Sequence, residues 1–210
     1  MSLQAISESL QKGKAKDVKQ LVQEQLDNGT KAKEILEEGL MAGMNVVGQR
    51  FKKNEIYVPE VLIAARAMTA GIEILKPFLI DEAVESKGTV VIGTVKGDLH
   101  DIGKNLVKMM MEGKGFNVVD LGTDVSAQQF ISAAQENKAN IICCSALLTT
   151  TMNEMKNVVA EAESAGLRES VKIMVGGAPI TEEFCESIGA DAYTGDAASA
   201  AEMALELVGA

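Results

Sequence analysis

Residues 88–105 read GTVVIGTVKGDLHDIGKN, and this stretch decides the fold. Its first part, residues 89–94, is a short β-branched run of the kind that forms a buried strand. A glycine-containing loop with the only histidine of the chain, His100, follows the run, and a helical pattern begins at about residue 102. An apolar strand that leads through a loop into a helix is the repeating unit of a parallel α/β sheet.

The same alternation continues to the C-terminus. Further strands are expected at 117–119, 140–144, 171–175 and 191–193, with helices at 102–113, 126–137, 152–165, 181–188 and 197–208. These strands are almost wholly apolar, which is typical of a parallel sheet covered by helices on both faces. We therefore expect residues 88–210 to form a doubly wound, five-stranded α/β domain of the flavodoxin-like or Rossmann-like kind.

Residues 1–85 have a helical period instead. Their apolar residues recur every three or four positions, and turn residues separate the segments. Thr30 is expected to cap one helix, and Pro59 suits the first turn of another. We predict a four-helix bundle here, joined to the α/β domain by a charged linker at residues 82–87.

The composition excludes several classes of function. The net charge of -10, from 30 acidic and 20 basic residues, disfavours binding to nucleic acid or to an anionic membrane. Three cysteines without a disulfide pattern, no signal peptide and no apolar run long enough to span a bilayer favour the cytoplasm. One histidine cannot build a site that needs several imidazoles.

His100 is the leading candidate for a functional residue. It follows the first strand, at the edge where open parallel sheets bind ligands. Asp98 precedes it by two residues, a spacing at which a carboxylate can accept the second imidazole N–H, as happens in metal-bound histidines. Gly97 and Gly103 flank the pair and allow a bulky ligand to approach the backbone. A lone histidine here can also be a helix cap or a surface residue.

Three motifs together resemble a known family. Residues 97–103, Gly-Asp-Leu-His-Asp-Ile-Gly, resemble the D-x-H-x-x-G signature of cobalamin-binding proteins of the methionine synthase type. Ser145-Ala146-Leu147 matches the S-x-L motif of that family, and Gly176-Gly177 matches its glycine pair. Each motif lies at the expected carboxyl end of a strand.

The N-terminal half is similar to the helical cap of the same family. The similarity rests on residues 43–48, on Phe51 and on residues 57–61. Free-standing chains of these two modules resemble the corrinoid proteins of methanol, methylamine and methoxy-compound methyltransferase systems.

The resemblance implies that the protein binds cobalamin or a related corrinoid, with His100 as the lower axial ligand of cobalt. Asp98 would accept the imidazole N–H, and a hydroxyl would complete a relay of catalytic importance. We favour Thr151 for that hydroxyl, although the family often has serine there, and a helix N-cap is an equally good explanation of Thr151.

The contacts of the family, carried onto matching positions, extend the cofactor site. They are Gly97, Asp98, Leu99, His100, Asp101, Ile102, Gly103, Ser145, Leu147, Thr149, Gly176, Gly177 and Ala197, with Glu37, Phe51 and Val58 in the cap. Simpler explanations stay open: strand ends and turns in the α/β domain, a helix cap at 197, core packing for Phe51 and Val58, and a solvated helix face for Glu37.

The implied function is that of a methyl carrier, which is one component of a methyltransferase system and not a complete enzyme by itself. Cobalt would take a methyl group from a substrate:corrinoid methyltransferase and pass it to a second methyltransferase, with tetrahydrofolate or a thiol as acceptor, as the cofactor alternates between methylcob(III)amide and cob(I)amide. A reductive activator protein would rescue oxidised cobalt, and a hinge is expected in the linker.

Two other functions use the same motif. One is the cobalamin-binding subunit of an adenosylcobalamin-dependent mutase, and the other is a cobalamin-dependent sensor. A small helical cap suits a methyl group better than the bulky adenosyl group, and no DNA-binding or signalling domain is evident.

Overall fold

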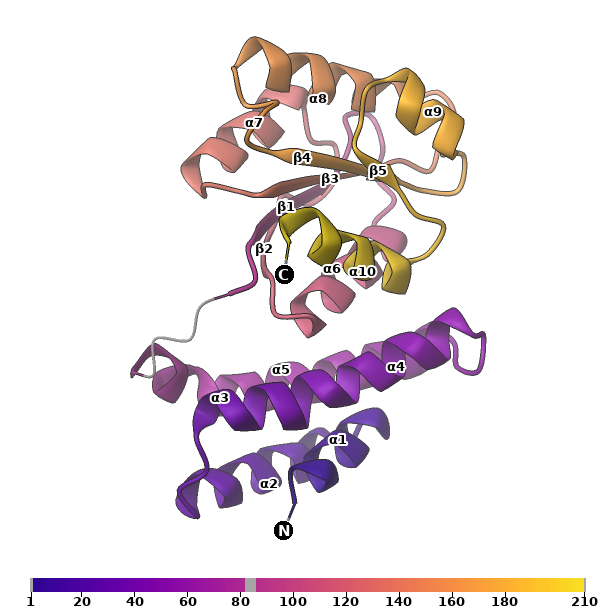
Figure 1. Cartoon of the computed structure of the whole chain (residues 1–210). Helices are drawn as coiled ribbons and strands as arrows, with labels where there is room; N and C mark the ends of the chain where they lie inside the picture. Colours follow the sequence, from indigo (N-terminus) through magenta and orange to yellow (C-terminus); the bar gives the residue numbers. More distant parts are fainter. Residues whose placement is uncertain (1, 82–85, 210) are drawn as a thin grey trace. The chain divides into compact units, whose positions relative to one another are not determined.

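The computed structural model describes residues 2–81 and 86–209, which form two compact units, one of helices alone and one of strands and helices (Figure 1). Residues 82–85 of the predicted linker, and with them most of the expected hinge, lie outside the described residues. None of the helices in the described parts of the chain combines the length and the apolar character that a membrane span requires.

The first unit is built from four helical runs. The third run is continuous from residue 32 to residue 52 and contains a π-helical segment, η1. In chain order the elements are α1 (Leu3–Gln11), α2 (Ala15–Asp27), α3 (Ala32–Glu34), η1 (Ile35–Met41), α4 (Ala42–Lys52) and α5 (Val58–Asp81).

These helices pack as a bundle around a shared apolar core. α5 packs against α2, and α1 packs against α4 and η1. Two glycines let α1 come close, because a Cβ at Gly43 would lie 3.0 Å from Ser7 Cα and one at Gly39 would lie 3.3 Å from Ile6 Cγ2. The predicted helical bundle is confirmed. Its fully buried side chains include Ile6, Leu10, Val18, Val22, Leu40 and Leu75.

Two local features of the bundle differ from expectation. Thr30 does not cap a helix: Lys31 occupies the N-cap position of α3, and the Thr30 hydroxyl donates to Gln25 Oε1 at 3.0 Å. The cap prediction is therefore wrong, because an amide of the preceding helix takes the hydroxyl. The π-helical segment was not predicted either, since the spacing of apolar residues does not distinguish it from an α-helix.

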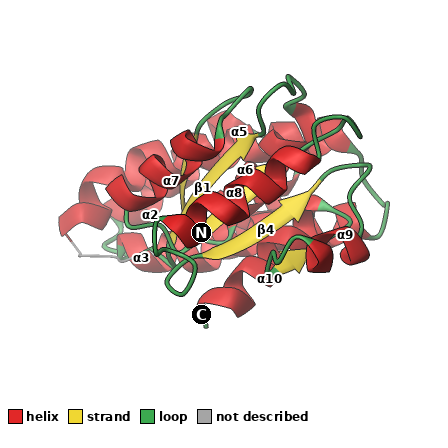
Figure 2. Cartoon of the chain, turned by 90° about the horizontal axis from the view of Figure 1, so that it is seen from above, coloured by secondary structure: helices red, strands yellow, loops and turns green. Residues whose placement is uncertain are grey.

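The second unit is a five-stranded sheet in which every neighbouring pair is parallel. The strand order is β2-β1-β3-β4-β5. In Figure 2 the arrows of β1 and β4 point the same way. The strands are β1 (Thr89–Thr94), β2 (Asn117–Asp120), β3 (Ile141–Ser145), β4 (Lys172–Gly176) and β5 (Ala192–Tyr193).

Helices cover both faces of the sheet, as predicted. α6 and α10 lie on one face, and α7, α8 and α9 lie on the other (Figure 1). The elements are α6 (Ile102–Gly113), α7 (Ala127–Glu136), α8 (Asn153–Ser164), α9 (Glu182–Ser187) and α10 (Ala197–Val208). Val91 and Ile142, from the neighbouring strands β1 and β3, are fully buried with Phe130 of α7. Gly93 makes room for that ring, because a Cβ there would lie 2.8 Å from Phe130 Cζ.

The strand order creates a topological switch point at the carboxyl edge of the sheet, between β1 and β3. The chain leaves β1 toward α6 on one face and leaves the neighbouring strand β3 toward α8 on the other face. The loops after these two strands therefore start side by side and then diverge. In open α/β sheets this is where ligands bind.

Two adjacent glycines, Gly176 at the end of β4 and Gly177 directly after it, allow a test of backbone packing. Gly177 has a φ of +135°, and a Cβ there would collide with the carbonyl oxygen of Ala146, whereas no heavy atom lies within 4 Å of a Cβ at Gly176. We expect Gly177→Ala to lower the free energy of unfolding by about 2–4 kcal/mol, since strain and a backbone clash combine. Gly176→Ala is the matched control and should cost less than about 1 kcal/mol. Urea unfolding of the cofactor-free protein, followed by circular dichroism, measures both, and equal costs would contradict this account.

Candidate functional site

The site is built on the loop between β1 and α6. A turn at its start is closed by the Asp98 N–H, which donates to Val95 O at 3.1 Å. Gly97 occupies this turn with a φ of +80°, a backbone conformation that favours glycine. The turn sends the Asp98 side chain inward, where it is 0% exposed, and leaves His100 at the surface, with 53% of its side chain exposed.

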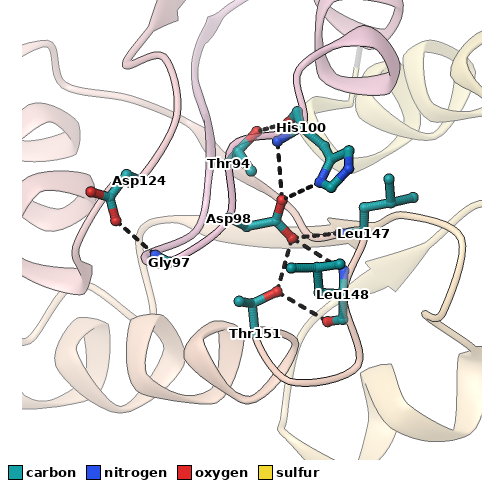
Figure 3. A network of polar contacts seen from close by, with 8 residues as sticks. All are labelled: Thr94, Gly97, Asp98, His100, Asp124, Leu147, Leu148 and Thr151. Atoms are coloured by element: carbon teal, nitrogen blue, oxygen red, sulfur yellow. Dashed lines mark hydrogen bonds and ion pairs between the residues drawn. The ribbon is translucent and has the colours of Figure 1, made fainter.

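Asp98 is the centre of a network of polar contacts (Figure 3). Its Oδ1 accepts from the His100 main-chain N–H at 3.1 Å and lies 2.9 Å from His100 Nδ1. Its Oδ2 accepts from the N–H groups of Leu147 and Leu148 at 2.8 and 3.2 Å and from the Thr151 hydroxyl at 2.8 Å. One buried carboxylate thus joins the loop after β1 to the loop after β3.

These contacts determine the charge of Asp98. Burial alone would raise its pKa, but the hydrogen bonds from Leu147, His100 and Thr151 outweigh burial and hold the pKa of Asp98 well below its usual value. The group is therefore a carboxylate at neutral pH and can only accept hydrogen bonds.

The charge of Asp98 also settles the state of the neighbouring imidazole. Because the carboxylate has no proton to donate, His100 Nδ1 must carry the proton between them. A neutral imidazole then has an unprotonated Nε2 with a free lone pair. No group in the described residues 2–81 and 86–209 forms a hydrogen bond with this Nε2.

Thr151 contacts Asp98 and does not cap α8. The helix begins at Asn153, and its N-cap residue Met152 makes no side-chain cap bond. The Thr151 side chain is buried, and its hydroxyl has Asp98 Oδ2 at 2.8 Å and Leu148 O at 3.0 Å as acceptors. The helix-cap explanation therefore does not hold for Thr151.

Four large apolar side chains are exposed on, or directly after, the two loops that Asp98 joins, and we call them the apolar rim. Leu99 and Ile102 flank His100 in sequence and are 74% and 70% exposed, while Leu147 and Leu148 come from the loop after β3 and are 41% and 40% exposed. Within the described part of the α/β unit, these four are the exposed large hydrophobic residues. Apolar side chains exposed in this way on neighbouring loops mark a binding surface.

The other expected contacts in this unit follow the same edge. Ser145 ends β3 and is partly buried, and Thr149 is exposed in the next loop. Asp101 and Gly103 are exposed at the start of α6, and a Cβ at Gly103 would meet open space. Ala197 opens α10 after the N-cap Asp196, whose side chain accepts from the Ser199 N–H, and it is only 8% exposed.

The three expected cap residues lie in the helical unit. Phe51 and Val58 flank the short loop between α4 and α5, and both side chains are partly exposed, so neither is a plain core residue. Glu37 is exposed in η1, with its Oε1 4.0 Å from Lys33 Nζ. Met44, by contrast, is a core residue at 2% exposure.

Two residues of the site were missed by the sequence analysis. Thr94 is fully buried at the end of β1, and its hydroxyl donates to His100 O at 2.7 Å. Asp124, in the loop after β2, accepts from the Gly97 N–H at 2.7 Å. Thr94 could have been suspected from a hydroxyl at a strand end, whereas nothing in the sequence links Asp124 to Gly97 across 27 positions.

The residues at this edge fit a corrinoid. No three His, Cys, Asp or Glu side chains come together to hold a bare metal ion anywhere in the described chain. A single free imidazole nitrogen is nevertheless what a cobalt ion needs when a corrin ring already supplies its four equatorial ligands. The apolar rim suits the largely apolar body of such a ring. There is also open space at Gly176, because a Cβ at this position would have no heavy atom within 4 Å.

Comparisons with known proteins agree with this fit. Two family models, each described as a B12 binding domain, match residues 88–205 and residues 2–76. The dimethylamine corrinoid protein of Methanosarcina barkeri is 45% identical over 194 residues, which cover 92% of this chain and 91% of that protein. Trimethylamine corrinoid protein 1 of Methanosarcina acetivorans is 45% identical over 176 residues, covering 83% of this chain and 82% of that protein.

A solved structure extends the similarity to three dimensions. A chain in the crystal structure of the methanol:cobalamin methyltransferase complex from Methanosarcina barkeri superposes with a TM-score of 0.89. The two sequences are 32% identical, and the match covers 99% of this chain and 79% of that chain. Through both its helical unit and its α/β unit, the chain belongs to the family of B12-binding corrinoid proteins.

Proposed function

We propose that this protein carries a methyl group between two methyltransferases on the cobalt of a corrinoid that it holds through His100. The observation that carries the proposal is the His100 imidazole, which Asp98 holds at Nδ1 while Nε2 has no hydrogen-bond partner among the described residues. The exposed side chains of the apolar rim lie on or directly after the same two loops. The names of the relatives support the choice of methyl transfer over mutase or sensor chemistry. Bound here, a corrinoid would supply a cobalt ion that accepts a methyl group and gives it up again.

His100 and Asp98 would act as one unit in this task. Asp98 fixes the ring orientation and keeps the proton on Nδ1, so that the Nε2 lone pair can serve as the lower axial ligand. A negative carboxylate beside Nδ1 also makes the imidazole more basic, so that Nε2 would bind cobalt more strongly. A shift of the Nδ1 proton along the 2.9 Å contact with Asp98 would change how strongly Nε2 binds.

Thr151 would be the outer member of the same relay. The Thr151 hydroxyl and the main-chain N–H groups of Leu147 and Leu148 donate to Asp98 Oδ2 and stabilise its charge, which leaves Oδ1 to His100. If Oδ2 lost the hydrogen bond from Thr151, the strength of the interaction between Oδ1 and the imidazole would change. Thr151 would therefore act on His100 through Asp98.

The remaining edge residues would hold the body and the nucleotide tail of the corrinoid. Leu99, Ile102 and Leu147 would cover apolar parts of the ring. Further contacts are proposed at positions that are exposed or partly exposed at this edge, namely Gly97, Asp101, Gly103, Ser145, Thr149, Gly176 and Gly177. Ala197, whose side chain is buried, is proposed as one more contact.

The helical unit would protect the opposite side of the cofactor. We propose residues 1–85 as a cap domain and residues 88–210 as the cofactor domain. Phe51 and Val58 are partly exposed apolar residues that would exclude water from the methyl group, and Glu37 would reach a polar edge of the ring.

The partners follow from the carrier role. One methyltransferase would load the methyl group from a substrate, a second would pass it to tetrahydrofolate or to a thiol, and a reductive activator would restore oxidised cobalt. We also propose the cytoplasm as the site of action, since the three cysteines, all within the described residues, are free thiols that suit a reducing compartment.

The proposal predicts that the lower ligand of cobalt is a histidine nitrogen. The protein is loaded with hydroxocobalamin, reduced to the cobalt(II) state and labelled with nitrogen-15 histidine. Because His100 is the only histidine, electron paramagnetic resonance should show coupling to one labelled nitrogen, and His100→Ala should lose this coupling and bind corrinoid at least about tenfold more weakly. Uptake of no corrinoid, or a spectrum in which benzimidazole remains the ligand, would refute the proposal.

The second prediction separates the hydroxyl of Thr151 from its volume. Thr151→Val removes the donor to Asp98 and should lower both the free energy of unfolding, by about 1–2 kcal/mol, and the fraction of cobalt(II) that carries the histidine ligand. Thr151→Ser keeps the donor and should preserve the histidine-bound fraction. If valine lowered stability but left that fraction unchanged, Thr151 would be a structural residue only.

A further inference from the structure

The loop that carries His100 is held from two sides. On one side, the Asp98 carboxylate binds the loop after β3, as described above. On the other side, the loop after β2 binds the main chain of the same segment, and none of these contacts involves the Asp98 carboxylate. The sequence motifs do not include this second set of contacts.

Asp124 makes the most direct of these contacts. Its Oδ1 accepts from the Gly97 N–H at 2.7 Å, and its own N–H donates to Asp98 O at 3.0 Å. One residue therefore forms hydrogen bonds with the N–H of Gly97 and the carbonyl oxygen of Asp98, in the turn that precedes His100. Asp124 has a φ of +56°, an unusual conformation outside glycine that aspartate and asparagine tolerate better than most residues.

Gly122 connects the loop after β2 to the main chain of His100 by way of Thr94. Its carbonyl accepts from the Thr94 N–H at 2.9 Å, and the hydroxyl of Thr94 donates to His100 O at 2.7 Å. The main chain of His100 is thus connected through Thr94 to the loop after β2.

A buried ion pair anchors the base of that loop. Lys104 Nζ donates to Asp120 Oδ1 at 2.6 Å, and the same oxygen accepts from the Gly122 N–H at 3.0 Å. The Lys104 side chain is 2% exposed and that of Asp120 is 22% exposed. Lys104 lies in the first turns of α6, directly after the His100 loop, so the pair fixes the far end of this loop to the end of β2.

Stability alone does not explain a lysine buried in this way. Burying two charges costs about as much as their attraction returns, and apolar pairs of similar size are often equally stable. An ion pair with a short hydrogen bond does add a fixed geometry. Here it holds the start of α6, where the His100 loop ends, against the end of β2.

We propose that Asp124, Gly122, Asp120 and Lys104 form a loop clamp that positions His100 through the main chain, independently of the Asp98 carboxylate. The inference rests on the proposed function in so far as His100 is taken to be the ligand. In this role Asp124 and Lys104 are positioning residues, which act on the imidazole by holding residues 97–100 in place. A loop with a flexible glycine at 97 would otherwise pivot about the buried Asp98.

Asp124 offers a clean pair of variants, because it is exposed and its replacement should not prevent folding. Asp124→Gly removes the side-chain acceptor and accommodates the positive φ, whereas Asp124→Asn keeps an oxygen acceptor and tolerates the same φ. In cofactor-free protein labelled with nitrogen-15 histidine, the single imidazole gives one pair of ring nitrogen resonances. We expect wild type and Asp124→Asn to show the same protonated Nδ1, and Asp124→Gly to show displaced or broadened resonances.

The loaded protein provides a second readout. Asp124→Gly should bind hydroxocobalamin about tenfold more weakly than wild type, and Asp124→Asn should stay close to wild type. Lys104→Met should move the imidazole resonances in the same direction as Asp124→Gly, and if Lys104→Met fails to fold, the Asp124 pair decides. Unchanged resonances and unchanged affinity in Asp124→Gly would overturn the clamp. A wild type that takes up no corrinoid would instead refute the proposed function, while the resonances of the cofactor-free protein would still test the clamp.

Discussion

The buried carboxylate of Asp98 is the constraint on which the site depends. A charge that is removed from water requires hydrogen-bond donors on every side, and Asp98 obtains them from His100, Leu147, Leu148 and Thr151. Because these donors belong to two different loops, satisfying one charge also fixes the loops to each other. The imidazole takes its orientation from the same carboxylate, so the interaction that holds the edge together also orients His100.

The parallel sheet makes this arrangement possible. β1 and β3 are neighbours, and their register pairs Thr94 with Ser145 at the carboxyl end. The loops after both strands therefore start at the same height, and then separate because α6 and α8 lie on opposite faces. In this position between the two loops Asp98 is buried, while the histidine two residues later stays half exposed.

The sequence was sufficient for the elements and for the centre of the site. Apolar periodicity located the strands and helices of the α/β unit within one or two residues, and the two-residue spacing of Asp98 and His100 indicated their contact. Thr30 was misjudged because a hydroxyl can bond a side chain as easily as a helix end. The contacts of Thr94 and Asp124 could not be read from the sequence, since they depend on which loops the strand order brings together.

The α/β unit is incomplete by itself at this edge. Full burial of an exposed large apolar side chain stabilises a protein by about 1.5–3 kcal/mol. The four side chains of the apolar rim forgo part of this energy, because they remain between 40% and 74% exposed. The loops cannot fold inward to cover them, because Asp98 from one side and the contacts of Asp124 from the other fix the backbone. The hydrogen bonds that hold the His100 loop in position thus also keep the rim exposed. A corrinoid that covers the rim would bury this exposed apolar surface.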